Sequence, residues 1–519
     1  MLVQPCVGDP FPIAASDPLQ LAEDAIRAED FPVAIRAYEE MLAPGAGAIA
    51  LLLHNLIPLY IRCRQPFKAL SAAEALTFFS PQEVGPWMAL AALRERFGDW
   101  EGALQALHVV LNLRPFHTEA HQSRLFLLAG HAPQEDVRQY HEDVAAALYP
   151  PLPHLPHPRP IPGKHLRVGY VSGDFRKHVM DRMIEALLRD ATKGEFELFA
   201  YDNSARSDEV TERLKGYGAT WRPIRDREDR EVADAIRADK IDVLVDLSGI
   251  TAGHRLGVFA RRPAPVQLTW AGYLPTTGAK FFDWKLCDAT SGLQQEYTEP
   301  LHRIPEGIVM GPLEGAPPVG AAPHRANGYI TFGCVNSWSK VNRECLDAWV
   351  EILRKVPTAR LIVVFGGSSE QNAALAVLRR FGSVQDRVML TEWQTGHRFP
   401  RVFTDIDIAL NTHPYGGCAT SFDTLWQGTP IVCLAGDRTV GRYAAHFQRK
   451  LNLDQFIAPD WKGYVSAAIG AAHRLTELDH IRSSLRDRMK AAGMLDTVAW
   501  VRSVEDTYRN IWRKHCEQH

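Results

Sequence analysis

Three segments in the first 130 residues carry the same arrangement of residues at nearly the same spacing. An alanine recurs 35 and then 34 residues further along the chain, and a proline follows each alanine after 10 or 12 residues. Apolar residues between these markers recur with the period of a helix. A short helical repeat cannot bury its apolar face alone and must stack on the next copy. We therefore expect a stack of paired helices in this part of the chain, marked by Ala34, Ala69 and Ala103 with Pro44, Pro81 and Pro115.

The period resembles that of tetratricopeptide repeats, in which a small residue lies where two helices approach closely and a proline ends the second helix. The resemblance implies a tetratricopeptide-like helical solenoid over residues 1–148, with a concave face that binds peptides. Three repeats are the practical minimum for a stable stack. An unrelated helical bundle is the alternative interpretation.

A proline-rich stretch, YPPLPHLPHPRPIPGKH, occupies residues 149–165. Proline removes a backbone donor and fixes φ, so this stretch favours extended polyproline geometry over helix or sheet. We interpret it as a semi-rigid tether between the helical repeats and the rest of the chain.

From Leu166 onward, apolar β-branched segments alternate with amphipathic helical segments. This alternation is typical of parallel sheets covered by helices on both faces. A second proline- and glycine-rich stretch, PLEGAPPVGAAPHRANG, divides the alternation into two blocks, 166–326 and 327–519. We expect two Rossmann-like lobes facing each other across a cleft. Ligands of such sheets bind beyond the carboxyl ends of the strands.

Composition excludes several classes of function. The formal net charge is −3, so no global basic field indicates a nucleic-acid partner. The N-terminal residues lack a basic region followed by an apolar core, and no apolar run is long enough to span a membrane. The eight cysteines form no CxxC pair, which argues against a zinc site or a disulfide framework. We expect a cytoplasmic protein without a membrane span or a bound metal.

The stretch NTHPYGGCATSFDTLWQGTPIV, residues 411–432, leads from the end of a strand into a helix. Gly416 and Gly417 would let backbone N–H groups approach an anion, and the helix that follows presents its positive N-terminus. Thr420 adds a donor, and Asp423 is placed to accept hydrogen bonds from sugar hydroxyls. These residues indicate a site for a nucleoside diphosphate. A tight turn capped by Thr420 or Asp423 explains the same residues equally well.

Two further strand ends carry candidate residues. Asn336 and Lys340 lie in GCVNSWSKVN after the first strand of the second block, where a lysine can neutralise a departing diphosphate. His178 follows the first strand of the first block and can accept a proton near neutral pH. Solvated loop side chains are the alternative for both, and Asp239, before a later strand, could be a turn residue.

Four motifs together resemble the catalytic domain of the protein O-linked N-acetylglucosamine transferases, including bacterial and SPINDLY-like members. They are RVGYVSGDFRKH, DLSGITAGHRLGVFARRPAPVQLTWAGY, FGCVNSWSKV and PYGGCATSFDTLWQGTPIVCLAGDRTVGR, in the family's order from about residue 160 onward. The resemblance implies a GT-B fold and an inverting, metal-independent transfer of a sugar from a UDP-sugar to a protein. No cofactor is implied beyond the UDP-sugar as co-substrate. The acceptor would be a serine or threonine hydroxyl of a protein docked by the helical repeats.

The resemblance also implies roles for individual residues. His178 matches the cleft histidine proposed as base, Lys340 the leaving-group residue, and Asp239 an aspartate proposed for proton relay. His397 lies near the uracil-contacting histidine, with a local spacing that differs by about two residues. The remaining residues expected to bind the nucleotide-sugar are Asn336, Gly416, Gly417, Ala419, Thr420, Asp423 and Arg442.

Two positions depart from the family pattern. Ile250 stands where many bacterial relatives have histidine, and Leu274-Pro275 lies where they have a Gly-Tyr-Pro-Gly-Thr sequence. A different donor sugar or acceptor, such as flagellin, an adhesin or an asparagine side chain, is therefore an alternative. An inactive peptide-binding scaffold is a second alternative. A nonhydrolysing UDP-sugar epimerase shares the two-lobe fold but needs no helical arm.

Overall fold

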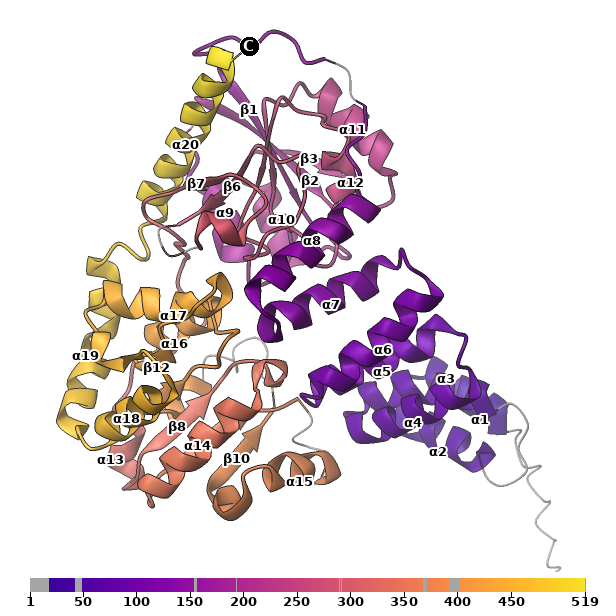
Figure 1. Ribbon diagram of the computed structural model, residues 1–519, viewed down its shortest axis with the longest axis vertical. Helices are drawn as coiled ribbons and strands as arrows, with labels where there is room; N and C mark the ends of the chain where they lie inside the picture. The colour runs from indigo at the N-terminus through magenta and orange to yellow at the C-terminus, as the bar shows by residue number, and fades with distance from the viewer. Residues whose placement is uncertain are drawn as a thin grey trace, which may run out of the picture.

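The computed structural model describes residues 18–42, 49–153, 156–192, 194–288, 290, 292–366, 371–392 and 402–518. Three parts are visible in Figure 1: a stack of N-terminal helices, a first α/β lobe and a second α/β lobe. The expected fold class, helical repeats followed by two Rossmann-like lobes, is confirmed. His397 lies outside the described residues.

Helices packed in pairs form the N-terminal part. Ala34, Ala69 and Ala103 have no exposed surface, because their small side chains let neighbouring helices approach closely. Asp30 and Asp99 cap the second helix of a pair by accepting from Val33 N and Gly102 N. The helices are α1 Pro18–Arg27, α2 Phe31–Met41, α3 Ile49–Arg62, α4 Pro66–Phe79, α5 Val84–Arg96, α6 Trp100–Leu113, α7 Thr118–His131 and α8 Gln134–Leu148.

The first lobe is a parallel seven-stranded sheet in the order β3-β2-β1-β4-β5-β6-β7. Its buried β-branched and aromatic strand residues face helices on both sides. The strands are β1 Leu166–Ser172, β2 Phe196–Asp202, β3 Thr220–Pro223, β4 Val243–Asp246, β5 Val266–Thr269, β6 Trp284–Cys287 and β7 Leu301–Arg303. The helices are α9 Asp181–Arg189, α10 Glu209–Lys215, α11 Asp229–Ala238 and α12 Leu256–Phe259.

The second lobe is a parallel six-stranded sheet in the order β10-β9-β8-β11-β12-β13. Its strands are β8 Thr331–Cys334, β9 Arg360–Val364, β10 Val388–Thr391, β11 Ile408–Leu410, β12 Ile431–Leu434 and β13 Ile457–Ala458. Its helices are α13 Pro323–Asn327, α14 Arg343–Lys355, α15 Gln371–Arg379, α16 Ala419–Trp426, α17 Thr439–Lys450, α18 Trp461–Ala472 and α19 Leu475–Ala491.

The strand order reverses at the same place in both sheets. In the first lobe the reversal lies between β1 and β4, and in the second between β8 and β11. Loops that leave the carboxyl ends of these four strands form the crevice in which doubly wound sheets bind ligands. The loop after β1 contains His178, the loop after β8 contains Asn336 and Lys340, and the loop after β11 contains the two glycines.

The helical repeats pack directly on both lobes, which corrects the interpretation of 149–165 as a tether. Val144 and Ala145 of α8 are buried in a hydrophobic cluster of the first lobe. Phe97, just after α5, packs against Phe365 of the second lobe and accepts a hydrogen bond from Trp338 Nε1. Within the proline-rich stretch, Leu152 contacts the first lobe, since its backbone N donates to the carbonyl oxygen of Ala260.

The last helix, α20 Thr497–Gln518, leaves the second lobe and packs on the first, as Figure 1 shows in yellow. Trp500, Val504 and Tyr508 are buried among the strands and helices of the first lobe. The predicted boundary, which placed all of 327–519 in the second lobe, is therefore wrong for this helix. Its apolar face indicated burial but not which sheet would cover it.

Candidate functional site

The glycine-rich loop after β11 is held by a network of buried amides. Asn336 Nδ2 donates to Asn411 Oδ1 at 2.9 Å and to Thr412 Oγ1 at 2.8 Å. Gly417 N donates to Asn411 Oδ1 at 3.0 Å. A Cβ atom on Gly417 would lie 2.7 Å from Asn336 Oδ1, and one on Gly416 would lie 2.7 Å from Asn411 Nδ2. The loop therefore needs glycine at both positions to approach these amides.

Helix α16 begins at the end of this loop without a side-chain cap. Cys418 is the N-cap residue, and its side chain accepts no hydrogen bond from the first turn. The first N–H groups of a helix have no partners within the helix, so they can bind an anion. Ala419 and Thr420 form the first turn and are partly exposed. The structure thus presents open donors and the positive end of a helix dipole.

Lys340 places an ammonium group beside the loop. Its Nζ donates to the carbonyl oxygen of Gly416 at 3.2 Å and lies 4.1 Å from the centre of the Tyr415 ring. Burial lowers the pKa of Lys340 from 10.5 to about 8. The group is still mostly charged at pH 7, and an arriving anion would favour the charged form further.

Asp423, one turn inside α16, pairs with a residue of the other lobe. Arg182 on α9 donates from Nη1 to Asp423 Oδ1 at 2.7 Å and from Nη2 to Oδ2 at 3.1 Å. Only 13% of the Arg182 side chain and 5% of the Asp423 side chain are exposed. The carboxylate expected to accept from sugar hydroxyls is therefore held by an interlobe ion pair in this structure.

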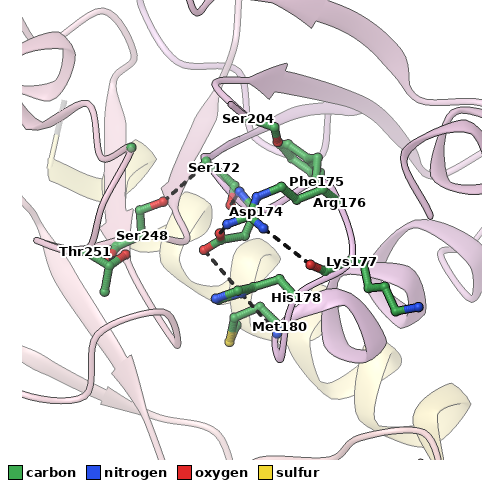
Figure 2. Close-up of polar contacts among 12 residues, drawn as sticks. Ser172, Asp174, Phe175, Arg176, Lys177, His178, Met180, Ser204, Ser248 and Thr251 are labelled. Carbon is green, nitrogen blue, oxygen red and sulfur yellow. Dashed lines mark hydrogen bonds and ion pairs between the residues drawn. The ribbon is translucent and has the colours of Figure 1, made fainter. Parts of the chain in front are cut away.

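His178 lies on the first-lobe side, in the turn that enters α9 (Figure 2). Its Nδ1 is 3.4 Å from Asp174 Oδ2. Burial is the main cause that lowers the pKa of His178 below its ordinary value, although the charge of Asp174 acts in the opposite direction. Burial also raises the pKa of Asp174. A histidine that is neutral at pH 7 and held by a carboxylate has the properties of a general base.

His178 lies close in sequence to the residue that makes the interlobe ion pair, Arg182. His178 precedes Arg182 by four residues, and the segment between them enters α9 with a hydrogen bond from Asp181 N to the carbonyl oxygen of His178. The histidine therefore lies in the turn that directly precedes the helix whose first turn contacts α16. His178 follows β1, and Lys340 and the glycine-rich loop follow β8 and β11, so each lies after the carboxyl end of a strand at the switch point of its sheet.

Asp239 does not join this group. It follows α11 and precedes β4, which places it at the amino edge of the sheet. Its carboxylate pairs with Arg222 and accepts a hydrogen bond from Tyr201. The expectation of a proton-relay aspartate at this position is therefore wrong. The carboxylate beside the His178 ring is that of Asp174, in the loop after β1.

Two other residues noted in the sequence analysis, Arg442 and Ile250, make contacts that differ from a role in binding the nucleotide-sugar. The Arg442 guanidinium, expected to bind the nucleotide-sugar, is paired with Glu296 of the first lobe and donates to the carbonyl oxygen of Asp437. Ile250, the departure from the family pattern, is buried in a hydrophobic cluster that also contains Tyr273. It contributes to the first-lobe core and adds no polar group to the cleft.

Three residues of the site were missed by the sequence analysis. Arg182 lies one turn beyond the predicted His178, and Asp174 lies four residues before it. Asn411 is the first residue of the quoted glycine-rich stretch and follows β11 directly. A polar side chain immediately after a buried strand was the available signal for Asn411 and Asp174.

Within the described part of the chain, no group of three or more His, Cys, Asp or Glu side chains is arranged to hold a metal ion. The helices of this part include none with the length and apolar character that crossing a membrane requires. The seven cysteines whose positions are described carry free thiols.

Comparison with known proteins identifies the family. The model of Glycosyl transferase family 41 matches residues 130–314 and 323–504, well over half of the chain. The chain belongs to glycosyl transferase family 41. Both matched ranges contain the candidate residues, since His178 lies in the first and Lys340 and the glycine-rich loop lie in the second.

The relatives of this family 41 chain include plant proteins and a bacterial one. It is 33% identical over 369 residues to a probable UDP-N-acetylglucosamine–peptide N-acetylglucosaminyltransferase SPINDLY of Solanum lycopersicum, covering 69% of this chain and 40% of that protein. The SPINDLY protein of Oryza sativa subsp. japonica is 32% identical over 431 residues, and the match covers 80% of this chain and 46% of that protein. This chain therefore spans less than half the length of these relatives. A mutant of O-GlcNAc transferase from Thermobaculum terrenum superposes with a TM-score of 0.84 at 31% identity, covering 96% of this chain and 98% of that one.

Proposed function

We propose that this chain is an inverting, metal-independent glycosyltransferase that moves N-acetylglucosamine from UDP-N-acetylglucosamine to serine or threonine hydroxyls of a protein. One observation carries the proposal: Lys340 and the uncapped N-terminus of α16 converge on one glycine-rich loop at the switch point of the second sheet. The names of the SPINDLY relatives and of the Thermobaculum terrenum protein supply the choice of sugar and acceptor.

The diphosphate of the donor would lie against the first turn of α16. Open N–H groups, the helix dipole and the Lys340 ammonium together oppose its negative charge. This charge increases as the bond between the sugar and the diphosphate breaks, so donors fixed in place beforehand stabilise the transition state more than the ground state. The protein thus supplies from its own residues the positive charge that the leaving group requires.

The acceptor hydroxyl must lose its proton while it attacks the anomeric carbon. The pKa of His178 is lowered by burial and its ring lies beside Asp174 in the loop after β1, so we assign it the role of base, with Asp174 orienting its ring. Attack from the side opposite to the leaving diphosphate converts an α-linked sugar into a β-linked product. The displacement of Asp239 to the far edge of the sheet leaves it no part in this step.

An open groove gives the acceptor protein a path to the cleft. It has a volume of about 670 Å³ and lies between helices α5 and α7 and the residues around Gly253 in the first lobe. A Cβ atom on Gly173, next to Asp174, would lie 3.1 Å from Gly253 Cα, so a residue that lines the groove packs against the loop after β1. This arrangement supports docking of the acceptor by the helical repeats, which would increase its effective concentration at the cleft.

The test is UDP release from a panel of UDP-sugars, with and without bacterial lysate protein, followed by intact-mass spectrometry of the protein. We expect release with UDP-N-acetylglucosamine, a matching mass gain on protein and no loss of turnover in excess chelator. A mass gain with another sugar would assign a different donor, and loss of the sugar by base-induced elimination would separate a hydroxyl from an asparagine acceptor. Measurable UDP binding without turnover on any donor would favour an inactive scaffold.

A further inference from the structure

Asp423 lies where a negative charge is unfavourable for the proposed donor. It is one turn inside the helix whose N-terminus would bind the diphosphate, and its carboxylate is almost completely buried. Like charges in such a site are screened weakly, so an unpaired carboxylate would repel the diphosphate. Arg182 removes this obstacle, because its guanidinium gives the pair a net charge of zero.

The geometry of the ion pair leaves the carboxylate able to bind more than Arg182. Each of its oxygens has two acceptor positions, and Arg182 occupies one position on each. The two parallel hydrogen bonds also prevent the carboxylate from rotating. Arg182 is itself fixed, since its Nη1 donates to the carbonyl oxygen of Gly311 at 3.2 Å. The remaining acceptor positions therefore have a defined direction.

We propose that Arg182 is a positioning residue for the nucleotide. It holds Asp423 in the orientation in which the free acceptor positions bind the ribose hydroxyls, and it cancels the charge that would repel the diphosphate. This inference rests on the proposed function, namely that the donor is a UDP-sugar. Because Arg182 belongs to α9 and Asp423 to α16, the first lobe takes part in ribose recognition through Arg182.

The experiment measures ribose preference by calorimetry with UDP, 2′-deoxy-UDP and 3′-deoxy-UDP. Preference is the ratio of the dissociation constant of the weaker-binding deoxy analogue to that of UDP. A hydrogen bond to a charged acceptor gives the wild type an expected preference of at least about tenfold. In Arg182→Met and in Asp423→Asn the preference should fall below about threefold, and the double variant should lower it no further. Arg189→Met, which removes an arginine paired with Asp190 on the same helix, should keep the wild-type preference.

The outcomes separate this inference from the function on which it rests. A wild-type preference retained in Arg182→Met would overturn the positioning role, because a purely structural residue changes stability and overall affinity without changing the ratio. If Arg182→Met does not fold, Arg182→Lys takes its place. A single ammonium cannot hold both carboxylate oxygens, so the preference should still fall at least threefold, and an unchanged ratio would overturn the inference. Failure of the wild type to bind UDP would contradict the proposed function itself.

Discussion

Replacing Lys340 by methionine should reduce turnover and yet leave the protein at least as stable. Burial lowers the pKa of Lys340 from 10.5 to about 8, which corresponds to a cost of at most about 3 kcal/mol for the charged form at 1.36 kcal/mol per tenfold change. The contact with the Tyr415 ring offsets about 2 kcal/mol of this cost. Methionine fills a similar volume without a charge. We therefore expect the free energy of unfolding of Lys340→Met at pH 7 to be about 1 kcal/mol higher than that of the wild type.

The sign of the pH dependence follows from the same pKa. Between about pH 8 and 10.5 the unfolded chain holds a proton on Lys340 that the folded protein has lost, so wild-type stability rises with pH in this window. The advantage of Lys340→Met should therefore be largest below pH 8 and disappear above 10.5. The wild-type kcat/KM should fall as pH rises through about 8, because a neutral amine no longer opposes the charge of the leaving diphosphate.

The loss of turnover has an expected size. Removing one preorganised charged donor costs about 3–4 kcal/mol in the transition state, so UDP release should fall about 10²–10³-fold while UDP binding changes little. Urea unfolding, UDP calorimetry and a UDP-release assay on the same preparation measure the three quantities. A variant that is less stable than the wild type, or that keeps turnover within tenfold, would refute the reasoning.

Three further substitutions test other contacts, two in the site and one between α8 and the first lobe. His178→Gln should reduce transfer to protein about 10²–10⁴-fold with little change in UDP binding, and normal transfer would remove the histidine from the proton transfer. Gly417→Ala should weaken UDP binding at least tenfold, because the added Cβ would lie 2.7 Å from Asn336 Oδ1 and displace the loop; wild-type affinity in calorimetry would contradict this. His141→Phe leaves the buried Tyr273 hydroxyl without the ring nitrogen that lies 2.8 Å away, so urea unfolding should show a loss of about 1–3 kcal/mol, and unchanged stability would show that the contact is dispensable.

The sequence predicted many of the helices and strands, because their formation depends mainly on residues that are neighbours in the chain. The helix expected after Gly416 and Gly417 is α16, Ala419–Trp426, and strands alternate with helices from Leu166 onward as the pattern predicted. Buried strands with β-branched residues and glycine-rich strand ends have few other conformations open to them.

Contacts between distant segments were not predictable in the same way. Nothing near Arg182 in the sequence indicates that its partner is Asp423, 241 residues away. The misplacement of Asp239 was avoidable, since a residue that precedes a strand lies at the amino edge of a parallel sheet and ligands bind at the other edge. The family resemblance suggested a role that the topology of this chain does not support.

The return of α20 to the first lobe has a consequence for the order in which the protein can fold during synthesis. The first lobe begins at Leu166, but Trp500, Val504 and Tyr508 complete its hydrophobic core. A ribosome adds about 5–20 residues per second, so the lobe waits with an open apolar surface while the residues between β7, which ends at Arg303, and α20, which begins at Thr497, are added. During that interval the surface is a binding site for chaperones. A truncation before residue 497 would leave it exposed permanently, although the truncation removes no residue of the cleft.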